Sequence, residues 1–158
     1  MKWHKLIATA LGSGYSPFAP GTAGSIVGIG ILFITNWLIN DLGFELPAVL
    51  FFNLALIVGM LFLGTYSIKK VHTIWEHDAS KIVIDEVVGV WIAAIALPMR
   101  WEYYLAALLL FRFFDIAKPL FIRKIDAMKG HWSVMLDDVL AGIYTSIILQ
   151  SFLIIKFL

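Results

Sequence analysis

The stretch LPAVLFFNLALIVGMLFLGTYSI, residues Leu46 to Ile68, decides the fold class because it carries no charged residue over about 23 positions. As an α-helix it would be roughly 35 Å long at about 1.5 Å per residue. That length exceeds the ~30 Å hydrocarbon core of a bilayer. A lipid-exposed backbone must satisfy its own hydrogen bonds, so an apolar segment without strand-like alternation indicates a helix. The stretch therefore predicts a transmembrane helix.

The composition agrees with a membrane protein. Of the 158 residues, 61% are hydrophobic and 15% are charged, against about 45–50% and 25% in soluble domains. Cysteine is absent, which excludes disulfides, thiolate metal sites and a cysteine nucleophile. At this length we expect a single integral-membrane domain spanning residues 1–158.

Further apolar segments flank the central stretch, at 26–39, 87–97, 101–117 and 139–158. The segment 87–97 has only about 11 residues, so it is either a fifth crossing extended by the residues before it or a re-entrant or interfacial helix. Residues 1–11 have a short apolar run with Lys2 and Lys5. We therefore expect an all-α polytopic membrane protein with four to five transmembrane helices and a short amino-terminal interfacial helix.

Lysine and arginine in the loops predict the orientation, because they favour the cytoplasmic side. The amino terminus, the loop 69–81 and the segment 118–138 are rich in lysine and arginine. The turn 41–45 between them has none, and the turn 98–100 has one. Lys156, near the far end, disagrees weakly with this alternation. The alternation predicts a cytoplasmic amino terminus and places the motifs described below on the cytoplasmic face.

Acidic residues adjoin three of the apolar segments. Asp85 and Glu86 open one, Asp115 closes another, and Asp137 and Asp138 open the last. An ionised carboxylate beside hydrocarbon is costly unless a cation or a water-filled cavity compensates it. A helix cap or the helix dipole explains one acid of each pair, but not why both adjoin a membrane. The pattern favours a metal-dependent enzyme with these five residues as candidate metal-binding and catalytic groups.

Two cations accompany the acids. Arg112 lies three residues before Asp115, and Lys118 lies three residues after it, so all three can share one side of a helix end. A simple intrahelical ion pair is the alternative, although such a pair would not need to sit at the end of an apolar span. We interpret Arg112 and Lys118 as ligands of phosphate oxygens.

Residues 12–25, GSGYSPFAPGTAGS, are dense in glycine, proline and hydroxyl groups just before an apolar helix. Exposed amides at a helix amino terminus attract phosphate, which makes Gly21, Thr22 and Ser25 candidate substrate-binding residues. A surface loop with Thr22 or Ser25 as the helix cap explains the same composition equally well.

With these motifs assembled, the chain resembles the phosphatidylglycerophosphatase A family of bacterial membrane enzymes. The blocks that carry the resemblance are GSG at 12–14 with APGTAGS at 19–25, VIDEVVG at 83–89, FRFFD with KP within 111–119, and MLDDVLAG at 135–142.

The resemblance implies Mg²⁺-dependent hydrolysis of phosphatidylglycerophosphate to phosphatidylglycerol and phosphate, in phospholipid biosynthesis at the cytoplasmic face of the bacterial inner membrane. It implies a phospholipid substrate within membrane lipid, with no nucleic-acid partner. The five acids would hold the Mg²⁺, a hard cation that prefers oxygen ligands. Either a water molecule attacks the phosphate, or Asp115 or Asp137 forms a covalent aspartyl-phosphate.

Two other classes of protein place acids near a membrane. A CDP-alcohol phosphotransferase-like enzyme would need an Asp-Gly-x-x-Ala-Arg-like block, which the sequence lacks. A small ion-coupled transporter would carry charges near mid-span, whereas here they lie at the ends of the apolar segments.

Overall fold

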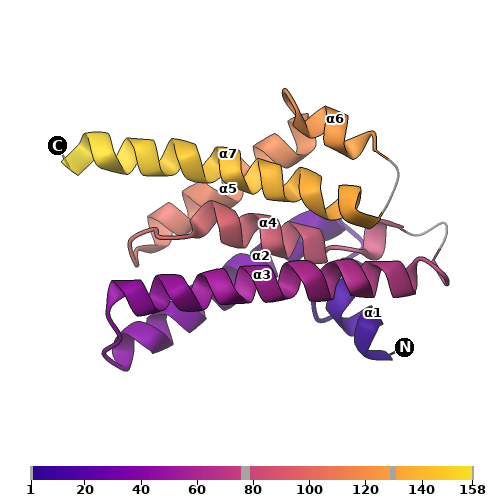
Figure 1. Cartoon of the computed structure of the whole chain (residues 1–158), viewed down its shortest axis with the longest axis horizontal. Coiled ribbons are helices and arrows are strands. Elements are labelled where there is room, and N and C mark those ends of the chain that lie inside the picture. The colour runs from indigo at the N-terminus through magenta and orange to yellow at the C-terminus, as the bar shows by residue number, and fades with distance from the viewer. Residues whose placement is uncertain (1, 76–78, 129–130, 158) are drawn as a thin grey trace.

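The computed structural model describes residues 2–75, 79–128 and 131–157, and every regular element in these ranges is helical (Figure 1). The seven α-helices are α1 (Lys2–Ala8), α2 (Pro20–Asp41), α3 (Leu46–Val71), α4 (Ile84–Ala94), α5 (Trp101–Ala117), α6 (Ile122–Asp126) and α7 (His131–Phe157). Two short 3₁₀ helices, η1 (Ser13–Tyr15) and η2 (Ala79–Lys81), lie in the connections. The all-α prediction is confirmed, and α1 lies where a short amino-terminal helix was expected.

Among the described residues, α2, α3 and α7 are long and apolar enough to cross a membrane. α5 has 17 residues, which gives a length of roughly 25 Å. α4 has 11 residues and would be only about 16 Å long, half the ~30 Å of the hydrocarbon core. The structure thus supports three spanning helices by length, fewer than the four to five that the sequence predicts.

The long helices and α4 alternate in direction along the chain (Figure 1). α2, α4 and α7 begin at one end of the bundle, and α3 and α5 return to it. The glycine-rich segment before α2, the start of α4 and the end of α5 consequently meet at one end. The turn before α3 and the turn after α4 lie at the other end.

α4 occupies the centre of the bundle, where it contacts α2, α3, α5 and α7. Nine of its 11 residues are buried, as expected for a helix that is apolar on all sides. Trp91 of α4 donates a hydrogen bond from Nε1 to the carbonyl oxygen of Gly28 in α2, at 2.7 Å. A Cβ atom at Gly28 would lie only 3.1 Å from the Cα of Val87, so the missing side chain lets α2 approach α4 closely.

The outer surface of α3 is strongly apolar. Phe51, Leu54, Val58 and Phe62 are all exposed on it. An apolar surface of this kind is unusual on a soluble monomer and fits contact with lipid. Polar side chains such as Asn53 are buried inside the bundle instead.

Two helices begin earlier than the sequence suggested. α2 begins at Pro20, because proline at the first helical position fits the fixed backbone angle and needs no hydrogen-bond donor. α7 begins at His131, more than one turn before Asp137. The interpretation of Asp137 or Asp138 as a cap of the last helix is therefore wrong, because both lie inside α7.

Candidate active site

A polar cavity of about 350 Å³ opens at the end of the bundle where α2, α4 and α7 begin. Its charged lining residues are Asp85, Glu86, Arg112, Asp115, Lys118, Asp126, Asp137 and Asp138. Six carboxylates thus face two cations, so the cavity has a strong excess of negative charge. Groups of like charge held this close favour the binding of a cation.

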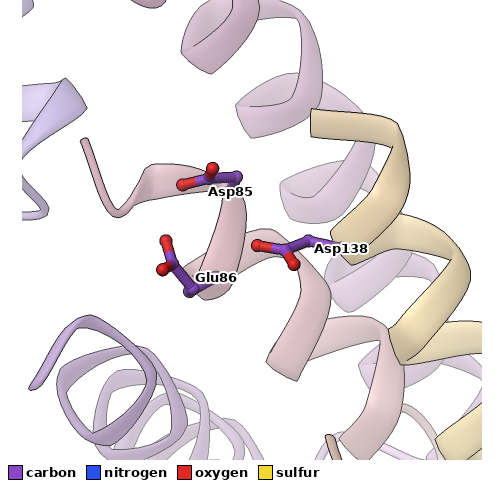
Figure 2. Close-up of side chains that lie close together, drawn as sticks. All are labelled: Asp85, Glu86 and Asp138. Carbon is purple, nitrogen blue, oxygen red and sulfur yellow. The ribbon is translucent and has the colours of Figure 1, made fainter. Parts of the chain in front are cut away.

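Three of the acids form a compact group (Figure 2). Asp85 and Glu86 come from the first turn of α4, and Asp138 comes from α7. One oxygen from each lies within 4.8 Å of the others. Asp85 is 8% exposed and Asp138 is 3% exposed. Asp85 Oδ1 and Glu86 Oε2 are buried without a hydrogen-bond partner among the described residues, which is a costly arrangement in the absence of a cation.

Glycines explain how α4 and α7 bring these acids together. Gly89 follows Asp85 by four residues, and Gly142 follows Asp138 by four, so each glycine shares a helix face with its acid. A Cβ at Gly142 would lie 2.4 Å from the carbonyl oxygen of Gly89, and one at Gly89 would lie 2.8 Å from the carbonyl oxygen of Asp138. The two backbones therefore touch one turn below the acids, and only glycine permits this contact.

Electrostatics in the compact group favour an added positive charge. Asp85 and Glu86 are neighbours in the first turn of α4, and Asp85 is buried. Two carboxylates held this close and away from water resist ionising together. A divalent cation bound between them would offset this resistance and keep both ionised.

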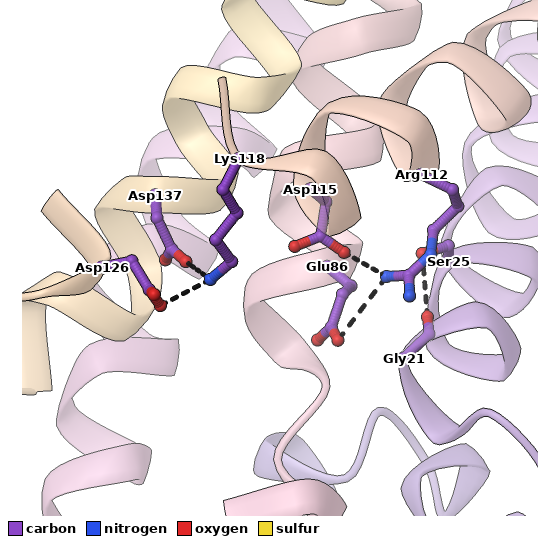
Figure 3. Close-up of polar contacts among 8 residues, drawn as sticks. All are labelled: Gly21, Ser25, Glu86, Arg112, Asp115, Lys118, Asp126 and Asp137. Carbon is purple, nitrogen blue, oxygen red and sulfur yellow. Dashed lines mark hydrogen bonds and ion pairs between the residues drawn. The ribbon is translucent and has the colours of Figure 1, made fainter. Parts of the chain in front are cut away.

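Arg112 lies beside the compact group on α5 (Figure 3). Its Nη1 forms an ion pair with Asp115 one turn later and lies 3.8 Å from Glu86 Oε1. Gly21 in the first turn of α2 leaves room for this arrangement, because a Cβ there would lie 2.2 Å from Glu86 Oε1 and 3.0 Å from Arg112 Nη1. Any larger residue at this position would displace both side chains.

Lys118 lies on the side of the cavity opposite Arg112 (Figure 3). Its Nζ donates hydrogen bonds to Asp137 Oδ2 at 2.6 Å and to Asp126 Oδ1 at 2.5 Å. Burial alone would lower the pKa of Lys118, but the hydrogen bonds to these two acids outweigh it and raise the pKa. Lys118 ends α5 with a positive φ of 45°, which turns the chain so that the side chain reaches back into the cavity.

The structure brings all five predicted acids and both predicted cations to this one cavity. Asp115 and Asp137 lie outside the compact group and pair with Arg112 and Lys118 instead. Asp126 was missed, since it lies in the short helix α6 away from any apolar span, and its spacing of eight residues from Lys118 gives no helical signal.

Only one of the three predicted substrate-binding residues of the glycine-rich segment lines the cavity. Gly21 lines the cavity, but Thr22 and Ser25 do not. Ser25 is fully buried, and its hydroxyl donates to the carbonyl oxygen of Gly21 at 2.8 Å. Its hydroxyl group therefore supports the first turn of α2 rather than facing the cavity.

Comparison with known proteins gives consistent matches. A family model described as Phosphatidylglycerophosphatase A matches residues 6–153. A protein of Bacteroides thetaiotaomicron, provisionally named a phosphatidylinositol-3-phosphatase, is 47% identical over 149 residues, covering 91% of this chain and 89% of that protein. A protein of Haemophilus influenzae named Phosphatidylglycerophosphatase A is 40% identical, covering 90% of this chain and 84% of that protein. A protein of Escherichia coli with the same name is 34% identical, covering 93% of this chain and 81% of that protein. No solved structure matches the chain significantly.

Proposed function

The chain belongs to the phosphatidylglycerophosphatase A family of lipid phosphate monoester hydrolases, and we propose that it removes the terminal phosphate of phosphatidylglycerophosphate to give phosphatidylglycerol and phosphate. The observation that carries this proposal is the compact group of Asp85, Glu86 and Asp138 beside Arg112, at the end of an apolar helical bundle. We propose that residues 1–158 act as one membrane phosphatase domain.

The donor set of the compact group fits Mg²⁺. Carboxylate oxygens are its preferred protein ligands, and two of the buried oxygens lack any partner within the described part of the chain. When bound, Mg²⁺ would supply positive charge to the phosphate oxygens and lower the pKa of a bound water. Asp85, Glu86 and Asp138 would hold it.

The remaining residues bind and orient the phosphate. Arg112 presents a planar group of N–H donors next to the compact group, which suits two oxygens of one phosphate. Lys118 adds a second positive charge across the cavity, where Asp126 and Asp137 accept its hydrogen bonds. Both would offset the charge that builds on the phosphoryl group during its transfer.

We assign the proton transfer to Asp137. Its Oδ2 accepts from Lys118, while its Oδ1 is buried without a partner among the described residues. In this step water attacks phosphorus, the bond from phosphorus to the glycerol oxygen breaks, and the proton of the water passes through Asp137 to that oxygen. Attack by a carboxylate, with an aspartyl-phosphate intermediate, is the alternative route.

Phosphate release by the purified protein in detergent micelles tests the proposal. Phosphatidylglycerophosphate should be hydrolysed with a higher kcat/KM than phosphatidylinositol 3-phosphate. The name of the Bacteroides relative motivates that second substrate, and the reverse preference would favour it. Release of CMP from a CDP-alcohol, or ion flux in vesicles without phosphate release, would support a phosphotransferase or a transporter instead.

Metal removal should abolish activity. We expect exhaustive EDTA treatment to lower phosphate release to background and added Mg²⁺ to restore it, because the buried acids need a cation to act together. Mg²⁺ should also raise the melting temperature of the metal-free protein, since a ligand that binds only the folded state stabilises it. Full activity after chelation would contradict a metal site.

We further propose that the active site faces the cytoplasm of a bacterial cell and that α4 and α5 join α2, α3 and α7 in the membrane. The support is the alternation of Lys and Arg between the two ends of the bundle. Because the chain has no cysteine, single cysteines can report the side on which each end lies.

Ala127 and Asn40 are exposed at opposite ends of the bundle. In intact cells, a membrane-impermeant maleimide should label Asn40→Cys, and it should label Ala127→Cys only after permeabilisation. Labelling of Ala127→Cys in intact cells would reverse the proposed orientation, and equal labelling of both variants would show that the ends do not lie on opposite sides.

A further inference from the structure

An apolar groove of about 360 Å³ lies between α2 and α5 on the outside of the bundle. On α2 it is lined by Gly30, Phe33 and Ile34, and on α5 by Trp101, Leu105 and Leu108. The missing side chain of Gly30 forms part of the hollow, because a Cβ there would meet no atom within 4 Å.

The groove leads towards the polar cavity. On α5, Arg112 follows Leu108 by four residues and therefore continues the same helix face. α2 also reaches that end of α5, because it begins at Pro20. The two helices remain adjacent at that end, where a Cβ at Gly21 would lie 3.0 Å from Arg112 Nη1. The seam between α2 and α5 thus has a phosphate-binding end and an apolar end.

The length of the seam suits a lipid chain. From Arg112 to Trp101 the rise along α5 is about 16 Å at 1.5 Å per residue. An acyl chain of a bilayer lipid is about as long as half of the ~30 Å hydrocarbon core, or about 15 Å. An acyl chain attached to a headgroup at Arg112 would therefore run along the groove to its far end.

We propose that the α2–α5 groove binds one acyl chain of the lipid phosphate substrate and so determines selectivity for long-chain lipids. This inference rests on the proposed phosphatase function. The groove accounts for a requirement of the reaction, because a phosphate held in the polar cavity must leave its glycerol and chains in contact with hydrocarbon. It also sets the direction from which the lipid enters, sideways from the bilayer between α2 and α5.

Filling the groove tests the proposal. Gly30→Leu places an apolar side chain in open space, so the fold should tolerate it, and leucine is also a better helix former than glycine. Gly59→Leu in α3 is the matched control, because a Cβ at Gly59 likewise meets no atom within 4 Å. If Gly30→Leu does not purify as a folded protein, Leu105→Trp fills the groove from the facing helix.

The substrates are a long-chain diacyl phosphatidylglycerophosphate and its dibutyryl analogue with the same headgroup. We expect Gly30→Leu to lower kcat/KM for the long-chain lipid at least about tenfold and for the dibutyryl analogue less than about twofold. Gly59→Leu should change neither. An equal loss on both substrates, or no loss on either, would overturn the acyl-chain site. Absence of phosphate release from both substrates by the wild-type protein would instead contradict the proposed function.

A photoreactive acyl chain gives a second readout that does not depend on turnover. A phosphatidylglycerophosphate carrying a diazirine in one chain should cross-link mainly to residues 29–34 and 101–108, and Gly30→Leu should remove most of this labelling. Labelling concentrated on the exposed face of α3, around Phe51 and Phe62, would place the chain elsewhere and refute the proposal.

Discussion

Asp138→Asn is expected to lower phosphate release at least about a thousandfold, which corresponds to roughly 4 kcal/mol of activation free energy. Asp138 is the one member of the compact acidic group that α7 supplies, and it is 3% exposed. Asparagine keeps the shape of the side chain but removes the charge, so Asp85 and Glu86 would be left to hold the cation from a single helix turn. Catalytic groups that act as a unit lose most of their effect when one is removed.

Stability separates a catalytic role of Asp138 from a structural one. A buried carboxylate without a cation is costly, so the metal-free Asp138→Asn protein should melt at or above the temperature of the metal-free wild type. The increase in melting temperature on adding Mg²⁺ should be lost. Asp41→Asn, at the exposed carboxyl end of α2, is the matched control and should change neither property. Near-normal turnover of Asp138→Asn would exclude Asp138 from the proposed metal site.

The acids of this site could be predicted from the sequence because charged residues are costly, and therefore rare, next to apolar membrane segments. In a chain with 15% charged residues, a carboxylate next to an apolar span needs an explanation. All five such residues line one cavity in the structure. Arg112 and Lys118 followed from their helical spacing to Asp115. The helical class followed from the same physics, since lipid leaves the backbone few alternatives.

The sequence did not reveal how deeply each helix is buried. The segment 87–97 looks like a weak transmembrane span, whereas the structure places α4 at the centre of the bundle, surrounded by four other helices. Its hydrophobicity reflects contact with protein rather than with lipid. The close contact of Gly89 with Gly142 depends on two segments far apart in the chain, and a single sequence does not show that pairing.

Local pattern was also misleading at two motifs. Thr22 and Ser25 resemble phosphate-binding hydroxyls, but α2 begins at Pro20 and neither residue lines the cavity. Asp126 carries no signal, because its contact with Lys118 depends on the fold of the connection between α5 and α7. The surroundings of Thr22 and Ser25 depend on where α2 begins, and helix boundaries are the least reliable part of a sequence-based prediction.

Arg112→Lys is expected to lower kcat about a hundredfold, or roughly 2.7 kcal/mol of activation free energy. Lysine keeps the positive charge, so the ion pair with Asp115 can persist. An ammonium group cannot, however, offer two parallel N–H donors to one phosphate. The loss should appear in kcat more than in KM, because the contact strengthens as charge builds on the phosphoryl oxygens during transfer.

Arg100, the residue immediately before α5, provides the matched control. It forms an ion pair with Glu102 at 2.8 Å, both side chains are exposed, and the pair lies at the opposite end of α5 from the cavity. Exposed pairs of this kind contribute little to stability, so Arg100→Lys should leave kcat within about twofold of the wild type. If Arg112→Lys behaves like Arg100→Lys, then Arg112 serves only to hold Asp115 and Glu86 in place, and the phosphate must be bound from the Lys118 side of the cavity.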